Sequence, residues 1–257
     1  DKEEKVVNLK SAAAGEASSR RKGIYLLPNL LTTGALFGGF YAVLSGFSGQ
    51  YEWAAMAIFS AMIFDGLDGR VARMTNTQSD FGVQYDSLSD MVSFGVAPAV
   101  VAYGWGVSDL GKLGLAAAFV YASCAALRLA RFNVQAESSD GKVFTGLPSP
   151  AAAALVAGFV WSTYELAPSV ALSVLGAVLT AAAGLLMVSN FKYPSFKEVD
   201  LRGKVPFIVI LSVVMGFVVI TIDPPRILFM LAVFFSFSAP LIWLAKKLGF
   251  SASPKAD

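Results

Sequence analysis

Four aspartates stand in or beside long apolar runs in the first half of the chain: Asp65, Asp68, Asp86 and Asp90. In a helix, residues three or four positions apart share a face, so Asp65 falls beside Asp68 and Asp86 falls beside Asp90. A turn over Met74–Phe81 would make the two helices neighbours and bring the four acids together. Unpaired carboxylates near hydrocarbon are costly, so this cluster predicts bound cations or a wet cavity.

The residue types in the chain narrow the chemistry open to this cluster. The chain has no histidine, which removes histidine nucleophiles, histidine bases and histidine-ligated zinc. Its single cysteine, Cys124, lies in an apolar run, which excludes a disulfide within the chain and a cysteine-rich metal site. Clustered carboxylates suit hard divalent cations such as Mg²⁺ and Mn²⁺. Alternatively, the acids cap helices or pair with Arg70 and Arg73, although two arginines cannot neutralise four acids.

The elements that carry the acids are predicted to be membrane helices. Of the 257 residues, 56% are hydrophobic and 15% are charged, and the mean hydropathy is +0.62. This composition is typical of an all-α polytopic membrane protein rather than a soluble domain. Eight apolar runs approach the ~20 residues that cross a bilayer. They lie at 28–46, 52–74, 83–105, 113–135, 149–165, 169–190, 205–222 and 227–247.

These runs predict a six-helix core followed by two additional C-terminal helices. The expected segments are a cytosolic tail at 1–22 with no signal-peptide core, the catalytic six-helix core at 23–190, a cytosolic loop at 191–204, the two additional helices at 205–247 and a second cytosolic tail at 248–257. Small residues in the first helix (Gly34, Gly38 and Gly39) indicate close helix packing, and such faces also allow a homodimer.

The distribution of positive charge predicts the orientation of these helices. All but two of the 20 Lys and Arg residues fall in or beside the segments on one side of the membrane. The two exceptions are Lys112 and Arg226. By the positive-inside rule, both termini and the acid cluster face the cytosol. A water-soluble substrate would then arrive from that side.

The acids belong to a longer pattern, D-x2-D-G-x2-A-R-x8-G-x3-D-x3-D, which also contains Ala72 and Gly82. It resembles the signature of the CDP-alcohol phosphotransferase family at every position. The resemblance implies two divalent cations, Mg²⁺ or Mn²⁺, which Asp65 and Asp86 bridge while Asp68 binds one and Asp90 the other. It also implies that Asp90 takes the proton from the attacking alcohol, and that the membrane is the inner membrane of a bacterium or an archaeon.

The same resemblance implies a site for CDP-diacylglycerol. Its expected residues are Pro28, Asn29, Leu30, Leu31, Gly69, Arg73 and Ser79. Gly69 has no side chain, so a phosphate could approach its backbone, and Arg73 is a bidentate phosphate donor one turn away. Ser79 has a simpler alternative role, because a serine in a turn is usually a helix cap.

Three further stretches bear on the acceptor alcohol: LRLARFN at 127–133, FTGLPSPAAA at 144–153 and LMVSNFKYPSFK at 186–197. Together with the acid pattern they resemble the integral-membrane phosphatidylserine synthases of the family. This implies transfer of a phosphatidyl group from CDP-diacylglycerol to L-serine, with release of CMP. An arginine would suit the serine carboxylate. The candidate serine-binding residues are Arg128, Arg131, Gly146, Pro148 and Ser149.

Alternatives remain for these residues and for the function. The two arginines could be positive-inside anchors, and residues 146–150 could be a rigid helix entry. A sibling enzyme could use glycerol 3-phosphate or inositol phosphate, although a phosphorylated acceptor would want a denser basic pocket. A divalent-cation transporter would show polar residues along a path through the membrane or inverted repeats. Membrane lipids are expected partners, and nucleic acid is not.

Overall fold

The computed structural model describes residues 26–136, 144–166, 169–193 and 207–248, which are mostly helical. The first helix lies at Leu26–Phe47. It is followed by α2 (Tyr51–Thr75), α3 (Asp80–Asp90), α4 (Ala97–Trp105), α5 (Lys112–Ala136), α6 (Ser149–Thr163), α7 (Val170–Val188), α8 (Phe207–Ile222) and α9 (Pro224–Lys247). A π-helical turn at Met91–Val96 joins α3 to α4, and a 3₁₀ turn at Val107–Leu110 precedes α5. Two short antiparallel strands are β1 (Phe144–Thr145) and β2 (Lys192–Tyr193).

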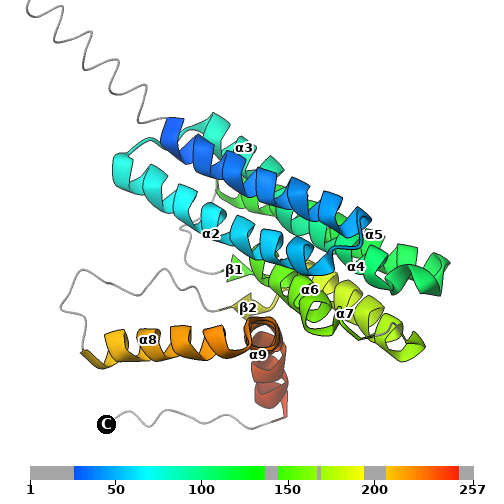
Figure 1. The fold of residues 1–257 in the computed structure, drawn as a ribbon. Helices are drawn as coiled ribbons and strands as arrows, with labels where there is room; N and C mark the ends of the chain where they lie inside the picture. Colours follow the sequence, from blue (N-terminus) through cyan, green and yellow to red (C-terminus); the bar gives the residue numbers. More distant parts are fainter. Residues whose placement is uncertain (1–25, 137–143, 167–168, 194–206, 249–257) are drawn as a thin grey trace, which may run out of the picture.

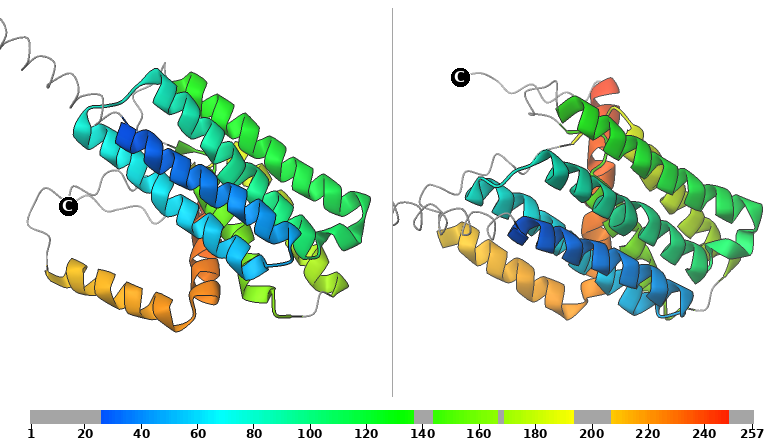
Figure 2. Two further views of the ribbon diagram at one scale, coloured as in Figure 1. Left: turned by 45° about the horizontal axis from the view of Figure 1, so that its top comes forward. Right: turned by 90° about the horizontal axis from the view of Figure 1, so that it is seen from above.

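The first helix and α2 to α7 form one elongated bundle (Figure 1). Two further views show most of these helices running along a common direction (Figure 2). In this bundle α5 packs against α7, and α6 packs against α2. Beyond it, α9 packs against α6 and crosses the bundle steeply, whereas α8 contacts α9 and extends away (Figures 1 and 2).

Among the described residues, four helices are long and apolar enough to cross a membrane: Leu26–Phe47, Lys112–Val134, Val170–Val188 and Pro224–Ala245. The chain is therefore an all-α integral membrane protein. The remaining helices fall short for visible reasons. Helices α3, α4, α6 and α8 have only 11, 9, 15 and 16 residues, and α2 carries charged residues near its end. The eight predicted spans remain a prediction, although each predicted range contains helix.

The sequence expectations did not include the π-helical turn and the two strands, and they placed the starts of the first helix, α3 and α9 two or three residues too late. The start of α9 has a clear physical reason. That helix begins at Pro224 rather than at 227. Asp223 explains the difference, because its Oδ1 accepts a hydrogen bond from the Arg226 backbone N–H at 3.3 Å and its Oδ2 pairs with the Arg226 guanidinium at 3.0 Å. A capping aspartate followed by proline is a strong helix start.

The first helix packs closely against α2 and against the π-helical turn. A Cβ added to Gly38 would lie 3.0 Å from the Ala57 carbonyl oxygen, and one added to Gly39 would lie 2.5 Å from Ser93 Cα. Ser93 Oγ donates to the Ala35 carbonyl at 2.9 Å across the second contact. The predicted role of these glycines in packing is therefore confirmed, and their small size holds the helix that carries Asp86 and Asp90 in place.

Backbone hydrogen bonds join the segment before α6 to the end of α7 and the residues just after it. Gly146 has φ +87°, a conformation that glycine adopts at no steric cost. Its N–H donates to the Phe191 carbonyl at 2.9 Å, and the Leu147 N–H donates to the Leu186 carbonyl at 2.9 Å. A Cβ on Gly146 would collide with the Met187 carbonyl. These contacts give Gly146 the structural role of a rigid helix entry; its part in serine binding stays a prediction.

Replacing Gly39 with alanine is expected to destabilise the protein, because the new methyl group would meet backbone atoms of the π-helical turn. Overpacking of this kind typically costs about 1–3 kcal/mol. Gly216→Ala is the matched control. Gly216 lies in α8, where an added Cβ meets nothing within 4 Å, and replacing a glycine inside a helix with alanine favours the helix. Thermal unfolding in detergent should show a lower Tm for Gly39→Ala only. Equal Tm values for the two variants would contradict the packing argument.

Candidate active site

The four acids come from two helices that the chain folds back on each other. Asn76 ends α2 in a left-handed conformation with φ 51°, and Ser79 caps α3 by accepting a hydrogen bond from the Gly82 N–H at 3.1 Å. The turn expected at Met74–Phe81 is therefore confirmed. It leaves Asp65 and Asp68 on α2 facing the acids of α3.

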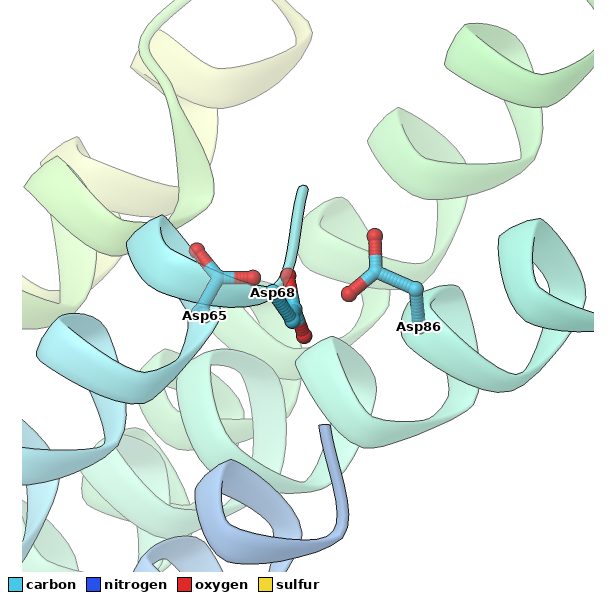
Figure 3. A group of neighbouring side chains, drawn as sticks. All are labelled: Asp65, Asp68 and Asp86. Atoms are coloured by element: carbon cyan, nitrogen blue, oxygen red, sulfur yellow. The ribbon is translucent and has the colours of Figure 1, made fainter. Parts of the chain in front are cut away.

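Three of the acids form a tight group between α2 and α3 (Figure 3). Oxygens of Asp65, Asp68 and Asp86 all lie within 4.8 Å of one another. Asp90, one turn further along α3, is within hydrogen-bonding reach of Asp65. Two carboxyl groups approach this closely when a proton or a cation lies between them, because bare negative charges repel.

The environment of the acids fits a divalent cation. Asp68 is buried and accepts a hydrogen bond from Thr32 Oγ1 at 2.6 Å. Asp86 Oδ1 is also buried, and it has no hydrogen-bond partner. Within the described residues, no ion pair joins Arg70 or Arg73 to any of the four acids. Carboxylate oxygens held close together, one of them buried without a partner, are a donor set that Mg²⁺ and Mn²⁺ prefer.

A cavity of about 310 Å³ opens beside the acids, and Asp68 and Asp86 form part of its wall. Most of the residues predicted to bind CDP-diacylglycerol line it, together with both small motif residues: Pro28, Asn29, Gly69, Arg73, Ser79, Ala72 and Gly82. Leu30 and Leu31 do not line it, and Leu30 is 62% exposed on the outside of the first helix. The cavity therefore gathers residues from the first helix, α2 and the start of α3.

Two glycines shape this cavity. A Cβ on Gly69 would lie 3.8 Å from Arg73 Nη1, so the guanidinium lies just above the bare backbone of α2. A Cβ on Gly82 would lie 3.2 Å from Ser79 Oγ and 3.6 Å from Asn29 Oδ1. Ser79 thus serves as the helix cap and also lines the cavity. A phosphate placed here would meet one cationic side chain and several small or polar groups.

Sequence reasoning missed several residues of the cavity wall, among them Thr32, Thr77, Gln78 and Phe132. Thr32 carried a usable signal, because it is a hydroxyl residue one helical turn after Pro28 in an otherwise apolar run. The structure gives it a role, since it holds Asp68 by a hydrogen bond. Phe132 carried no such signal, because its contribution depends on how α5 packs.

The two candidate arginines of α5 point to different partners. Arg128 Nη1 donates to Ser149 Oγ at 3.0 Å, and the guanidinium lies close enough to Asp90 to interact with it electrostatically. Its Nε is buried without a hydrogen-bond partner. Arg131 is exposed and donates from Nη2 to Asn190 Oδ1 at 3.2 Å. The structure thus brings Arg128 and Ser149 towards the acids and directs Arg131 towards the end of α7.

Comparison with known proteins identifies the family. The profile of the CDP-alcohol phosphatidyltransferase family matches residues 25–189. The chain belongs to the CDP-alcohol phosphatidyltransferase family. Membership makes it a membrane-bound transferase of phospholipid synthesis, and the match covers the first helix to α7 while leaving out α8 and α9.

Relatives within the CDP-alcohol phosphatidyltransferase family come from bacteria and archaea. The CDP-diacylglycerol–serine O-phosphatidyltransferase of Helicobacter pylori J99 is 39% identical over 198 residues, which is 76% of this chain and 83% of the relative. The Bacillus subtilis protein of the same name is 35% identical, over 67% of this chain and 92% of its own. The archaetidylserine synthase of Methanothermobacter thermautotrophicus is 36% identical, over 65% of this chain and 69% of its own.

Asp86→Asn is expected to weaken Mn²⁺ binding by at least about tenfold, since even an outer partner of a metal ligand typically contributes 10–100-fold to affinity. Asp80→Asn is the matched control, because Asp80 is an exposed acid on the same helix outside the cluster. Titration of the purified protein with Mn²⁺, followed by electron paramagnetic resonance, measures both affinities. Wild-type affinity in Asp86→Asn would remove this residue from the predicted ligand set.

Proposed function

We propose that this protein is an integral-membrane phosphatidylserine synthase, which transfers the phosphatidyl group of CDP-diacylglycerol to the hydroxyl of L-serine and releases CMP. The observation that carries the proposal is the meeting of Asp65, Asp68 and Asp86 beside a cavity whose wall includes Arg73. The fourth acid, Asp90, lies near Asp65 and near the Arg128 guanidinium. The printed names of the relatives support serine as the acceptor. One relative is named an archaetidylserine synthase rather than a phosphatidyltransferase, so the names of the relatives support the acceptor better than the donor lipid.

The donor would bind along the first helix and the start of α3. Its CDP part would lie in the 310 Å³ cavity, with its phosphates against Gly69 and the Arg73 guanidinium. Leu30 is 62% exposed on the outside of the first helix, where a lipid tail could run beside it. In this arrangement Leu30 and Leu31 contact the diacylglycerol part rather than the nucleotide, which explains why they do not line the cavity.

Asp65, Asp68, Asp86 and Asp90 would hold two divalent cations, Mg²⁺ or Mn²⁺. Bound there, the cations would neutralise the pyrophosphate and stabilise the attacking and leaving oxygens of an in-line displacement. The protein itself would hold the metal-binding carboxylates in position, because Thr32 fixes Asp68 by its hydrogen bond and the turn at Asn76 sets α3 against α2.

Asp90 would take the proton from the serine hydroxyl. The serine oxygen then forms a bond to the phosphatidyl phosphorus, the bond from that phosphorus to the CMP oxygen breaks, and CMP leaves. Arg128 is the expected partner of the serine carboxylate, because its Nε–H is buried without an acceptor and the guanidinium lies near Asp90. Ser149 would hold the guanidinium in place through its hydrogen bond to Nη1. Arg131 keeps the alternative role of a membrane anchor.

The proposal includes the predicted membrane arrangement. Eight helices would cross the inner membrane, with the catalytic core at 23–190, and both termini and the acid cluster would face the cytosol. The cytosolic location is supported by the charge distribution of the sequence. Serine and CMP, both water-soluble, would then enter and leave on the cytosolic side, while the donor lipid and its product stay in the bilayer.

A headgroup-transfer assay tests the function. Purified protein is incubated with CDP-diacylglycerol and, separately, with L-serine, glycerol 3-phosphate or inositol phosphate, and CMP release and lipid products are measured. We expect CMP release and a phosphatidylserine product with serine alone. CMP release with a phosphorylated acceptor and none with serine would place the chain elsewhere in the same family.

Arg128→Ala is expected to raise the KM for serine roughly 10–150-fold, because a hydrogen bond to a charged group contributes about 1.5–3 kcal/mol. Arg128→Lys should rescue only part of this loss, since lysine cannot reproduce the guanidinium fork. The KM for CDP-diacylglycerol should barely change. Arg131→Ala is the matched control three residues away on α5, and its serine KM should stay near the wild-type value. An unchanged serine KM in both Arg128 variants would return this arginine to a structural role.

A further inference from the structure

A second cavity, of about 460 Å³, lies between the end of α7, strand β2 and α9. One side is formed by Ser189, Asn190, Phe191 and Lys192, and the other by Ala239, Ile242 and Trp243. It shares no lining residue with the cavity beside the acids. Its first four residues belong to the stretch 186–197, which the proposed chemistry leaves without a role.

Positive charge gathers around this cavity. Lys192 is exposed in its wall. Arg131 donates a hydrogen bond to Asn190, which lines the cavity, and Lys247 Nζ lies 5.0 Å from the centroid of the Trp243 ring. No acidic side chain lines the cavity, and in the described part of the chain no ion pair engages Lys192. An anion is therefore the ligand that these cations would attract.

The cavity is also lined by large apolar side chains. Phe191 and Trp243 contact edge to face, with ring centroids 5.8 Å apart. Ile242 and Trp243 are 55% and 51% exposed on α9, one of the helices apolar enough to cross a membrane. A tryptophan followed by lysines near the end of such a helix is typical of the level of lipid headgroups. The cavity wall thus combines cationic side chains with apolar ones that are exposed on a candidate membrane helix.

We propose that this cavity binds an anionic phospholipid of the surrounding membrane, with the phosphate held by Lys192 and Asn190 and an acyl chain lying along Ile242 and Trp243. A free phosphate would use the cations but leave the apolar wall without a partner. Basic pockets between membrane helices hold anionic headgroups in this way. The Arg131–Asn190 hydrogen bond joins the site to the helix that carries Arg128, so the lipid binds at the acid-cluster end of the bundle.

Thermal unfolding of the full chain in detergent micelles tests this site, with phosphatidylglycerol and phosphatidylcholine of matched acyl chains as probes. Phosphatidylglycerol is expected to raise the Tm by at least about 2 °C, because a ligand of the folded state stabilises it. Phosphatidylcholine and inorganic phosphate should not. In Lys192→Gln, the phosphatidylglycerol concentration that gives half the shift should rise at least about tenfold, as expected for loss of a charge-assisted contact.

Two further variants keep the test decisive. Lys192→Arg should retain the wild-type response because it keeps the charge, and Asn190→Ala should lose affinity as Lys192→Gln does. Lys112→Gln is the matched control, since it removes an exposed lysine at the start of α5. An equal lipid response in Lys192→Gln and Lys112→Gln would overturn the site. Equal shifts with phosphatidylcholine, or a phosphate shift lost in Lys192→Gln, would overturn the anionic lipid as its occupant. This experiment measures unfolding rather than turnover, so its result is independent of the headgroup-transfer assay that tests the proposed function.

Discussion

Repulsion among four carboxylates is the constraint on which the rest of this structure depends. Oxygens of Asp65, Asp68 and Asp86 lie within 4.8 Å of one another, and like charges at that separation in a partly buried place oppose folding unless something balances them. Thr32 supplies Asp68 with one hydrogen bond. No arginine ion pair does so for any of the four among the described residues. A proton or a bound cation would balance the charge, and a bound cation would also be able to bind a pyrophosphate.

The fold meets this constraint by close packing of the helices around the cluster. Gly39 lets the first helix approach Ser93, and Ser89 Oγ and Ser93 Oγ donate to the backbone carbonyls of Thr32 and Ala35 at 3.1 and 2.9 Å. These contacts fix α3 and the π-helical turn beside the first helix. A π-helical turn changes the register of the residues that follow it, and such turns are common near functional sites. Here it directly follows Asp90.

The sequence predicted the parts of the site that depend on local helical geometry. The spacing of Asp65 and Asp68, and of Asp86 and Asp90, is enough to put each pair on one face, and a polar turn between two apolar runs is enough to make the pairs meet. Other parts depend on packing between distant segments. Arg128 and Arg131 stand three residues apart and look alike in sequence, and only the positions of Ser149 and Asn190 separate their roles. The backbone hydrogen bonds of Gly146 and Leu147 and the two short strands likewise depend on where α7 ends.

The central claim is that the acid cluster works through bound divalent cations, and cation removal during turnover tests it most directly. CMP release from CDP-diacylglycerol and serine is measured in excess EDTA, and then after addition of Mg²⁺ or Mn²⁺ beyond the chelator. The account predicts loss of CMP release in EDTA and its return with either cation, because the chain has no histidine and, among the described residues, no ion pair engages the clustered carboxylates. Full turnover in excess EDTA would contradict it.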